Sequence, residues 1–205
     1  MTTGGEGGMV TTNDRALWLS TWAQKDHGKS WEAVYEREHA PGFRWLHESF
    51  GDNWRMLEMQ AVLGRIQLGK MHDWHRQRAA NAEAIMAAAR ACPALRVPHV
   101  PEFVEHAWYK AYVQVRPEAL TSGWSRDRIM SQINALGVPC YSGSCSEMYL
   151  EKAFDGTPYR PAKRLSVAKE LGETSLMFLV HPTLSIAQIE KSCKVLTQVM
   201  HEATR

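Results

Sequence analysis

The sequence predicts an α/β to α+β fold, in which a long helix leads into a small mixed α/β layer domain. Two observations predict it. Between residues 55 and 91, apolar side chains recur every three to four residues, which is the period of a helix. Beyond residue 106, short apolar strands alternate with helical segments, as in layered folds. With 205 residues and 44% hydrophobic content, the chain is long enough to bury a core.

The first part of the chain is expected to hold a strand, a helix and an irregular stretch. The strand covers residues 9–12, after a glycine turn. The helix that follows has Asn13 as its N-cap and Gly28 as its stop. Residues 30–50 are mixed, because a Pro-Gly pair interrupts any helix there. The long helix then begins at Arg55.

The second part is expected to contain three strands and four helices. The strands lie within residues 106–116, 138–141 and 174–180, and the helices within 125–136, 147–154, 161–171 and 185–203. Ser125 and Ser185 each precede a helical pattern and are expected to be N-caps, since a serine hydroxyl can accept from the first free N–H groups.

Composition excludes several classes of function. The net charge of +2 gives no basic patch for nucleic acid, and no apolar run approaches the roughly 20 residues that cross a bilayer. No signal peptide is recognisable. The four cysteines are too few and too irregular for a disulfide framework, so they are expected to be reduced thiols. We therefore expect a cytoplasmic protein without nucleic-acid or membrane partners.

Tryptophan is concentrated near the N-terminus. Five of the eight tryptophans fall in the first 54 residues. Monomeric surfaces rarely display so many large aromatic side chains, so this part is expected to pack against another domain or a second subunit.

Two stretches are candidates for a binding site. The run Gly4-Gly5-Glu6-Gly7-Gly8 is neither a phosphate P-loop nor a dinucleotide fingerprint, and by itself fits a flexible tail or a tight turn. The motif Gly51-x-Asn53-x-Arg55-Met56-x-Glu58 fits a loop that ends in a helix, with Asn53 as its cap. A helix start also presents free N–H groups to an anion such as phosphate.

Metal sites are not expected. His72 and His75 can share a helix face, but no acidic or thiolate partner follows at a recognisable spacing. Cys140 and Cys145 are separated by the wrong distance for a redox or zinc motif.

Together, the glycine-rich stretch (Met1-Thr2-Thr3-Gly4 to Val10) and the segment from Phe50 to Ala61 resemble the DegT/DnrJ/EryC1/StrS sugar aminotransferases. This resemblance implies a fold-type I pyridoxal-phosphate-dependent transferase of the aspartate-aminotransferase-like superfamily. Residues 1–54 would be a remnant of the large cofactor-binding domain, residues 55–92 a long connecting helix, and residues 93–205 the small C-terminal α/β domain.

The resemblance also implies site residues and partners. Asn53 matches an asparagine that reaches the cofactor phosphate of the neighbouring subunit, and Arg55 an arginine close to the same site. The segment with Tyr141, Ser142 and Tyr149 matches a region bordering the sugar-binding cleft, although the usual histidine-rich pattern is missing. The partners would be a second copy in a homodimer, a nucleotide-sugar and an amino-acid donor.

No catalytic residue is expected within the chain itself. In the family, the lysine that holds the cofactor as a Schiff base precedes the glycine-rich stretch, and no lysine precedes it here. The chain is therefore expected to be a C-terminal fragment that is inactive alone, with the lysine upstream of Met1. The alternatives are a non-catalytic dimerising module of the same fold, or one that binds sugar nucleotides.

Overall fold

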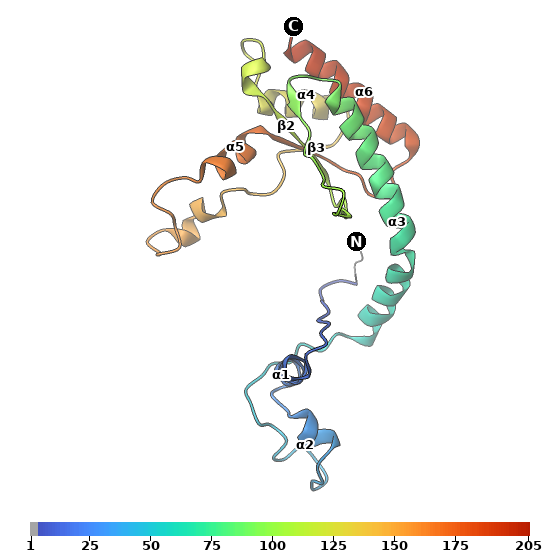
Figure 1. The fold of residues 1–205 in the computed structure, drawn as a ribbon, viewed down its shortest axis with the longest axis vertical. Coiled ribbons are helices and arrows are strands. Elements are labelled where there is room, and N and C mark those ends of the chain that lie inside the picture. Colours follow the sequence, from blue (N-terminus) through green and yellow to red (C-terminus); the bar gives the residue numbers. More distant parts are fainter. Residues whose placement is uncertain (1–3) are drawn as a thin grey trace. The chain divides into compact units, whose positions relative to one another are not determined.

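The computed structural model of the chain describes residues 4–205 (Figure 1). It divides into two compact units, of which the first ends at Lys70 and the second runs from Met71 to Arg205. The longest helix, α3 (Glu58–Arg90), belongs partly to each unit. Met1–Thr3, the start of the glycine-rich motif, lie outside the described residues. No helix in the described part is both long and apolar enough to cross a membrane.

The first unit contains α1 (Arg15–Lys25) and the short α2 (Trp31–Tyr35). The N-cap of α1 is Asp14, one residue after the predicted Asn13, because its Oδ1 accepts from the N–H groups of Ala16 and Leu17 at 2.8 and 3.1 Å. The helix ends as predicted at Gly28, whose φ of +82° suits a glycine and whose N–H donates to Ala23 O.

The predicted strand over residues 9–12 is wrong. These residues have no regular structure, and Met9 and Val10 are exposed. A strand needs a neighbour to satisfy its backbone groups, and the apolar pattern alone does not supply one.

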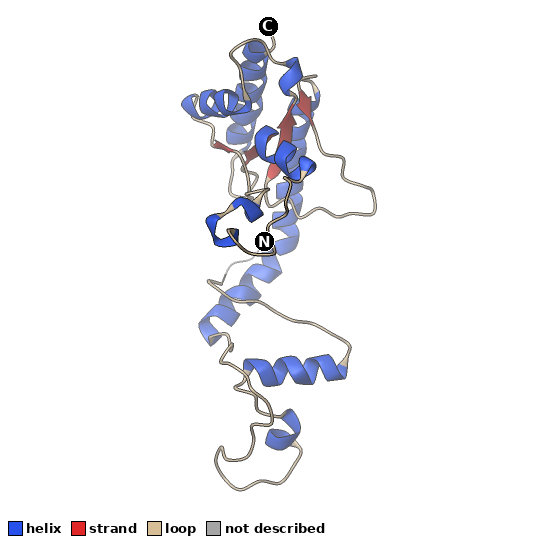
Figure 2. Cartoon of the chain, turned by 90° about the vertical axis from the view of Figure 1, so that its left-hand side faces the viewer, coloured by secondary structure: helices blue, strands red, loops and turns tan. Residues whose placement is uncertain are grey.

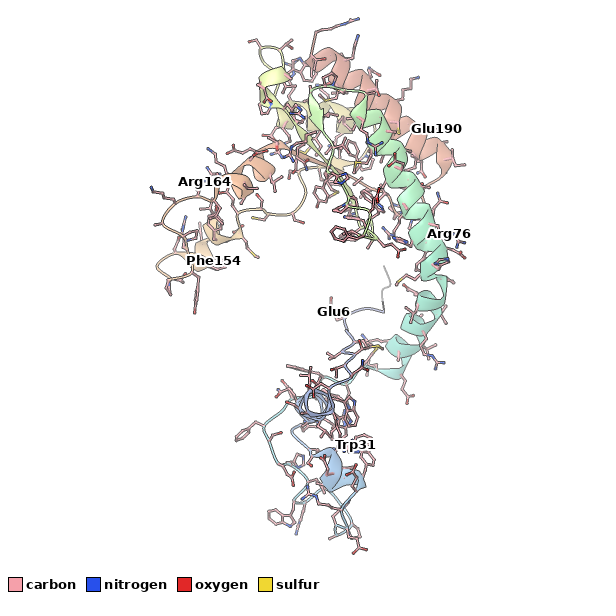
Figure 3. All side chains as sticks on the ribbon, viewed as in Figure 1. Glu6, Trp31, Arg76, Phe154, Arg164 and Glu190 are labelled. Carbon is pink, nitrogen blue, oxygen red and sulfur yellow. The ribbon has the colours of Figure 1, made fainter. Side chains whose placement is uncertain are left out.

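Aromatic side chains of α1 and α2 pack on one another. Trp31, labelled in Figure 3, lies at the centre, with ring centroids 4.9 Å from Trp18, 5.3 Å from Trp22 and 4.3 Å from Tyr35. Most of the tryptophan-rich region thus forms a small cluster of its own. Trp45 remains 89% exposed, however, so the cluster does not account for every aromatic side chain of this unit.

The second unit is built on an antiparallel sheet (Figure 2). Its order is β1-β2-β4-β3, and the bounds are β1 (Leu95–Arg96), β2 (Ala111–Val115), β3 (Cys140–Tyr141) and β4 (Ser175–Phe178). In the centre Val113 pairs with Leu176, and at the edge Cys140 pairs with Phe178. The three predicted strands are confirmed in shorter form, whereas β1 was not predicted.

Helices cover one face of this sheet. α4 (Arg126–Ala135) and α6 (Ile186–Ala203) pack on each other, and the second half of α3 joins the same core (Figure 1). The core-facing strand residues alternate along β2 and β4, as expected for a sheet with one buried face. They are Ala111, Val113, Val115, Leu176 and Phe178.

The expected caps of α4 and α6 are confirmed. Ser125 accepts from Arg128 N, and Ser185 forms a full capping box with Gln188. A short 3-10 turn, η1 (Pro117–Ala119), follows β2.

Three predicted helices differ from the structure, one in helix type and two in their bounds. Residues 147–154 form two short 3-10 helices, η2 (Met148–Leu150) and η3 (Lys152–Phe154), in place of an α-helix. The helix expected over residues 161–171 is α5 (Ser166–Thr174). The long helix expected from Arg55 begins at Glu58.

Candidate functional site

The segment around Asn53 is fastened to the end of α1 by main-chain hydrogen bonds. Asn53 forms an antiparallel bridge with Asp26. On either side, His27 N donates to Asp52 O, and Trp54 N donates to Lys25 O, each at 3.0 Å. This backbone pairing places the side chains of the predicted motif beside the last turn of α1.

Two glycines make this close approach possible. A Cβ atom at Gly51 would lie 2.4 Å from the backbone N of Gly28 and 2.9 Å from Ala23 O. At Gly28, a Cβ would lie 1.8 Å from Ser49 O. Only a residue without a side chain fits at either position, which explains the glycine that opens the Gly51-x-Asn53 motif.

The two predicted cofactor-binding residues are in direct contact. Arg55 Nε donates to Asn53 Oδ1 at 3.1 Å. The predicted role of Asn53 as a helix cap is wrong. The helix α3 begins only at Glu58, and the amide oxygen of Asn53 accepts a hydrogen bond from Arg55. Arg55 in turn reaches Asp26 Oδ1 through Nη1 at 3.0 Å, and its Nη2 lies 3.2 Å from His27 Nε2.

Asp26 is the centre of a cluster of cations. Its side chain is buried, with Arg55 at 3.0 Å, Lys29 at 3.5 Å and Lys25 at 3.7 Å. Burial alone would raise the pKa of the Asp26 carboxyl, but the charges of Lys29, Arg55 and Lys25 outweigh burial and lower it. One carboxylate thus faces three cations, and the local charge is positive.

Arg55 lines a cavity of about 910 Å³ in the first unit. Its walls combine the glycine-rich segment, α1 and the residues after Asn53: Gly8, Met9, Val10, Thr12, Trp18, Ser20, Thr21, Trp22, Gln24, Lys25, Trp54, Arg55 and Met56. Excess positive charge, guanidinium and amide donors and flanking aromatic rings are the chemistry that a phosphorylated aromatic group needs. The residues present therefore fit such a group.

The predicted substrate-binding residues lie in the second unit. Tyr141 is the last residue of β3 and is 49% exposed, and Ser142 follows it and lines a hollow of about 480 Å³. Tyr149, in η2, is half-buried. Asn53 and Arg55, in contrast, belong to the first unit.

The Tyr149 hydroxyl is already engaged. It donates to Glu147 Oε1 at 2.7 Å and accepts from Leu165 N at 2.9 Å. Glu147 also forms two hydrogen bonds with Arg164, which, like Phe154, lies on the long connection between β3 and α5 (Figure 3). Hydrogen bonds from Arg164 and Tyr149 lower the pKa of Glu147 to about 2. These contacts tie the two ends of this connection together.

Sequence reasoning missed Asp26, Glu147 and Arg164. A carboxylate just before a helix-ending His-Gly pair was a usable signal for Asp26, since Gly28 was already recognised as the helix stop. Nothing in the spacing of Glu147 and Arg164 indicates their pairing, because it depends on the path of an irregular segment.

Histidine and cysteine residues form no metal site in the described part of the chain, where no three candidate ligands come together. His75 contacts Glu105 and His106 O at 3.1 and 2.8 Å. All four cysteines are free thiols.

Comparison with known proteins identifies the family. Residues 1–197 match the DegT/DnrJ/EryC1/StrS aminotransferase family, and the chain belongs to it. Aminotransferases of this family generally depend on pyridoxal phosphate, are dimeric and use nucleotide sugars.

The similar proteins have longer sequences than this chain. The X-ray structure of an aminotransferase from Psychrobacter cryohalolentis is 60% identical, with a TM-score of 0.94, over 100% of this chain and 54% of that one. The spore coat polysaccharide biosynthesis protein SpsC of Bacillus subtilis is 34% identical over 54% of this chain and 28% of its own length.

An enzyme from Acidithiobacillus ferrooxidans, named UDP-N-acetyl-3-dehydro-alpha-D-glucosamine 3-aminotransferase, is 25% identical over 96% of this chain and 47% of its own. The chain spans about half the length, or less, of these relatives.

Proposed function

We propose that this chain is the C-terminal part of a pyridoxal-phosphate-dependent aminotransferase that moves an amino group from an amino acid to a nucleotide-linked keto-sugar. The observation that supports this proposal best is the hydrogen bond from Arg55 to Asn53, because Arg55, together with Lys25, also lines the cavity of the first unit. The activity in the name of the Acidithiobacillus relative supports a nucleotide-sugar substrate.

Asn53 and Arg55 would hold the cofactor phosphate, and in a homodimer that phosphate would belong to the neighbouring subunit. Arg55 supplies guanidinium N–H donors, and Asn53 supplies amide N–H donors. When bound, pyridoxal phosphate supplies the electron sink that transamination requires. The chain's own residues bind and orient the phosphate.

Tyr141 and Ser142 would contact the sugar substrate. Both have exposed side chains at the end of β3. The same role is predicted for Tyr149, but its only hydroxyl proton is donated to Glu147. A contact from Tyr149 to the sugar would therefore use its ring or the remaining lone pair of its oxygen.

The lysine that holds the cofactor would come from outside these 205 residues. Among the residues that line the cavity, Lys25 is the one lysine, and its ammonium is paired with Asp26 and lies 5.1 Å from the centroid of the Trp22 ring. The Lys25 side chain is therefore engaged with neighbours of its own and is not positioned to form the Schiff base. The isolated chain should therefore be inactive.

Covalent trapping tests this assignment. The purified chain is mixed with pyridoxal phosphate, reduced with borohydride and analysed by mass spectrometry. We expect no specific lysine adduct and no transamination. Stoichiometric modification of a single lysine would overturn the assignment of the lysine to another segment.

Phosphate recognition is tested with pyridoxamine phosphate, which needs no lysine, and with pyridoxamine as the matched control without phosphate. The indole N–H signals of Trp22 and Trp54, which line the cavity, report binding by NMR. We expect shifts with pyridoxamine phosphate, none with pyridoxamine, and loss of the shifts in Asn53→Ala. Equal shifts with both compounds would contradict the proposed phosphate site.

The alternative is a non-catalytic module of the same fold that dimerises or binds sugar nucleotides. The exposed apolar side chains in the first half of α3 favour the dimerising form. Such a module would associate in solution and would show no response to pyridoxamine phosphate.

A further inference from the structure

We propose that Asp26 is a positioning residue, which sets the orientation of Arg55 and, through Arg55, of the Asn53 amide. This inference rests on the proposed role of Asn53 and Arg55 at a phosphate. Asp26 would not touch the phosphate itself. The proposal is carried by a continuous chain of hydrogen bonds from a buried carboxylate to the two predicted ligands.

The first step is the rigidity of Asp26. It is 8% exposed and lies at the C-cap of α1, where its backbone N–H donates to Ala23 O. Its backbone also pairs with that of Asn53. The carboxylate therefore has a fixed position relative to the segment that carries both predicted ligands.

The second step is the orientation of Arg55. Its side chain is 46% exposed, and an arginine of this exposure would otherwise sample many rotamers. Three contacts restrict it: Nη1 to Asp26 Oδ1 at 3.0 Å, Nε to Asn53 Oδ1 at 3.1 Å, and Nη2 to His27 Nε2 at 3.2 Å. Together they fix the plane of the guanidinium group.

The third step concerns the Asn53 amide. Because its oxygen accepts from Arg55 Nε, its nitrogen faces the other way. The amide thus presents N–H donors, the groups that an anion requires, away from Arg55. The Arg55 backbone N–H also donates to this oxygen, but at a longer 3.4 Å. With the Arg55 side chain displaced, only this weaker bond would keep the amide oxygen from turning toward the phosphate and repelling it.

Charge and orientation predict opposite effects of removing the Asp26 carboxylate. Asp26→Asn removes a negative charge from a cluster that includes Lys25, Lys29 and Arg55. If Asp26 acted only through its charge, an anion would bind more tightly in the variant. If Asp26 orients Arg55, the anion binds more weakly, by about tenfold or more for the loss of a charge-assisted contact.

The experiment uses the full chain in two measurements. The first follows the Arg55 side-chain Nε–H signal by NMR, assigned by its absence in Arg55→Ala. We expect a resolved, exchange-protected signal in the wild type, its loss in Asp26→Asn and its partial recovery in Asp26→Glu. The second measures pyridoxamine phosphate binding in the same proteins, with an expected order of wild type, Asp26→Glu and Asp26→Asn.

Folding is controlled separately. Glu36→Gln removes an exposed ion pair with Arg15 in the same unit and should leave both measurements unchanged. Backbone amide signals from β2 and β4 show whether the second unit remains intact, and those of α1 show the same for the first. A loss of the Arg55 signal counts for the proposal only in a variant whose α1 signals persist.

The outcomes separate this proposal from the proposed function. An unchanged Arg55 Nε–H signal in Asp26→Asn, or tighter binding of pyridoxamine phosphate, overturns the positioning role. If the signal is lost but the wild type does not distinguish pyridoxamine phosphate from pyridoxamine, Asp26 still orients Arg55, and the phosphate site is what fails.

Discussion

Cys140 and Cys145 lie close in the sequence but in opposite environments. Cys140 is 1% exposed, and burial raises the pKa of its thiol to about 12. Cys145 is exposed in the connection that follows β3. A thiol reacts through its thiolate and must be reached by the reagent, so the two cysteines should differ sharply in reactivity.

We predict that Cys145 is modified first when the folded chain is treated with a disulfide reagent at neutral pH. Cys145→Ser should remove the fast phase, whereas Cys140→Ser should leave it intact. The release of the coloured thiol over time measures both. Rapid labelling of Cys140 in Cys145→Ser would contradict the burial described for β3.

Glu147 should make the stability of the chain depend on acidity. Its pKa falls from 4.5 to about 2 through its hydrogen bonds with Arg164 and Tyr149. A carboxyl whose pKa is lower in the folded state stabilises that state above about pH 4.5, and the contribution is lost as the pH falls toward about 2. Glu147→Gln should therefore be less stable than the wild type at neutral pH, and the difference should shrink in acid.

Urea unfolding at several pH values checks this prediction. Glu190→Gln, which changes an exposed carboxyl on α6, is the matched control and should show a nearly constant difference. A Glu147→Gln difference that does not change with pH would show that the pair with Arg164 does not form in solution.

At the scale of the helices, α6 begins with a complete capping box. Ser185 Oγ accepts from Gln188 N at 3.3 Å, and Gln188 Oε1 accepts from Ser185 N at 2.8 Å. We predict that Ser185→Ala lowers the free energy of unfolding by about 1 kcal/mol, because free N–H groups at the helix start lose a partner.

Ser192→Ala is the control for this prediction. Ser192 lies inside the same helix and donates to Gln188 O, so its removal leaves the helix start unchanged, and alanine is the better helix former. Thermal or urea unfolding of both variants provides the measurement. Equal losses of stability would indicate that the capping box contributes little.

The elements that the sequence predicts well depend on local interactions. Ser125 and Ser185 cap their helices as expected, and the alternation in residues 106–116 reflects one buried face of β2. The failures depend on distant partners. Residues 9–12 look like a strand but have none to pair with, and β1, at two residues, is too short to show a period.

The candidate site divides in the same way. The family motif predicts that Asn53 and Arg55 act together, and in the structure their side chains are hydrogen-bonded to each other. Asp26 was not foreseen, because its contact with Arg55 spans a stretch of irregular chain. The start of α3 at Glu58 also escaped prediction, since the hydrophobic period extends back to Met56 without a cap to define the first turn.

At the scale of the whole molecule, the first half of α3 presents an apolar surface. Met59, Val62, Leu63 and Ile66 are each between 51% and 74% exposed. Apolar patches of this kind usually mark an interface. We predict that the chain associates in solution through this helix, as a homodimer would require.

Sedimentation over a range of concentrations measures the association. Leu63→Lys combined with Ile66→Lys should lower the average mass toward that of the monomer. Val167→Lys, which places the same charge at a 65% exposed apolar position on α5, should have no such effect. A wild-type chain that is monomeric at all concentrations would contradict the prediction.

The close approach of Gly28 and Gly51 brings together the two ends of a segment that comprises residues 29–50. Because backbone hydrogen bonds from Glu48 and Ser49 to Gly28 O hold the two ends together, the far part of this segment can change in length without moving Arg55. Each doubling of its length costs only about 0.6 kcal/mol in closure entropy. Its tip, around Pro41 and Phe43, is exposed. Residues 38–42 are thus a natural insertion point, where a peptide tag or a reporter domain could be added while the Asp26 cluster stays in place.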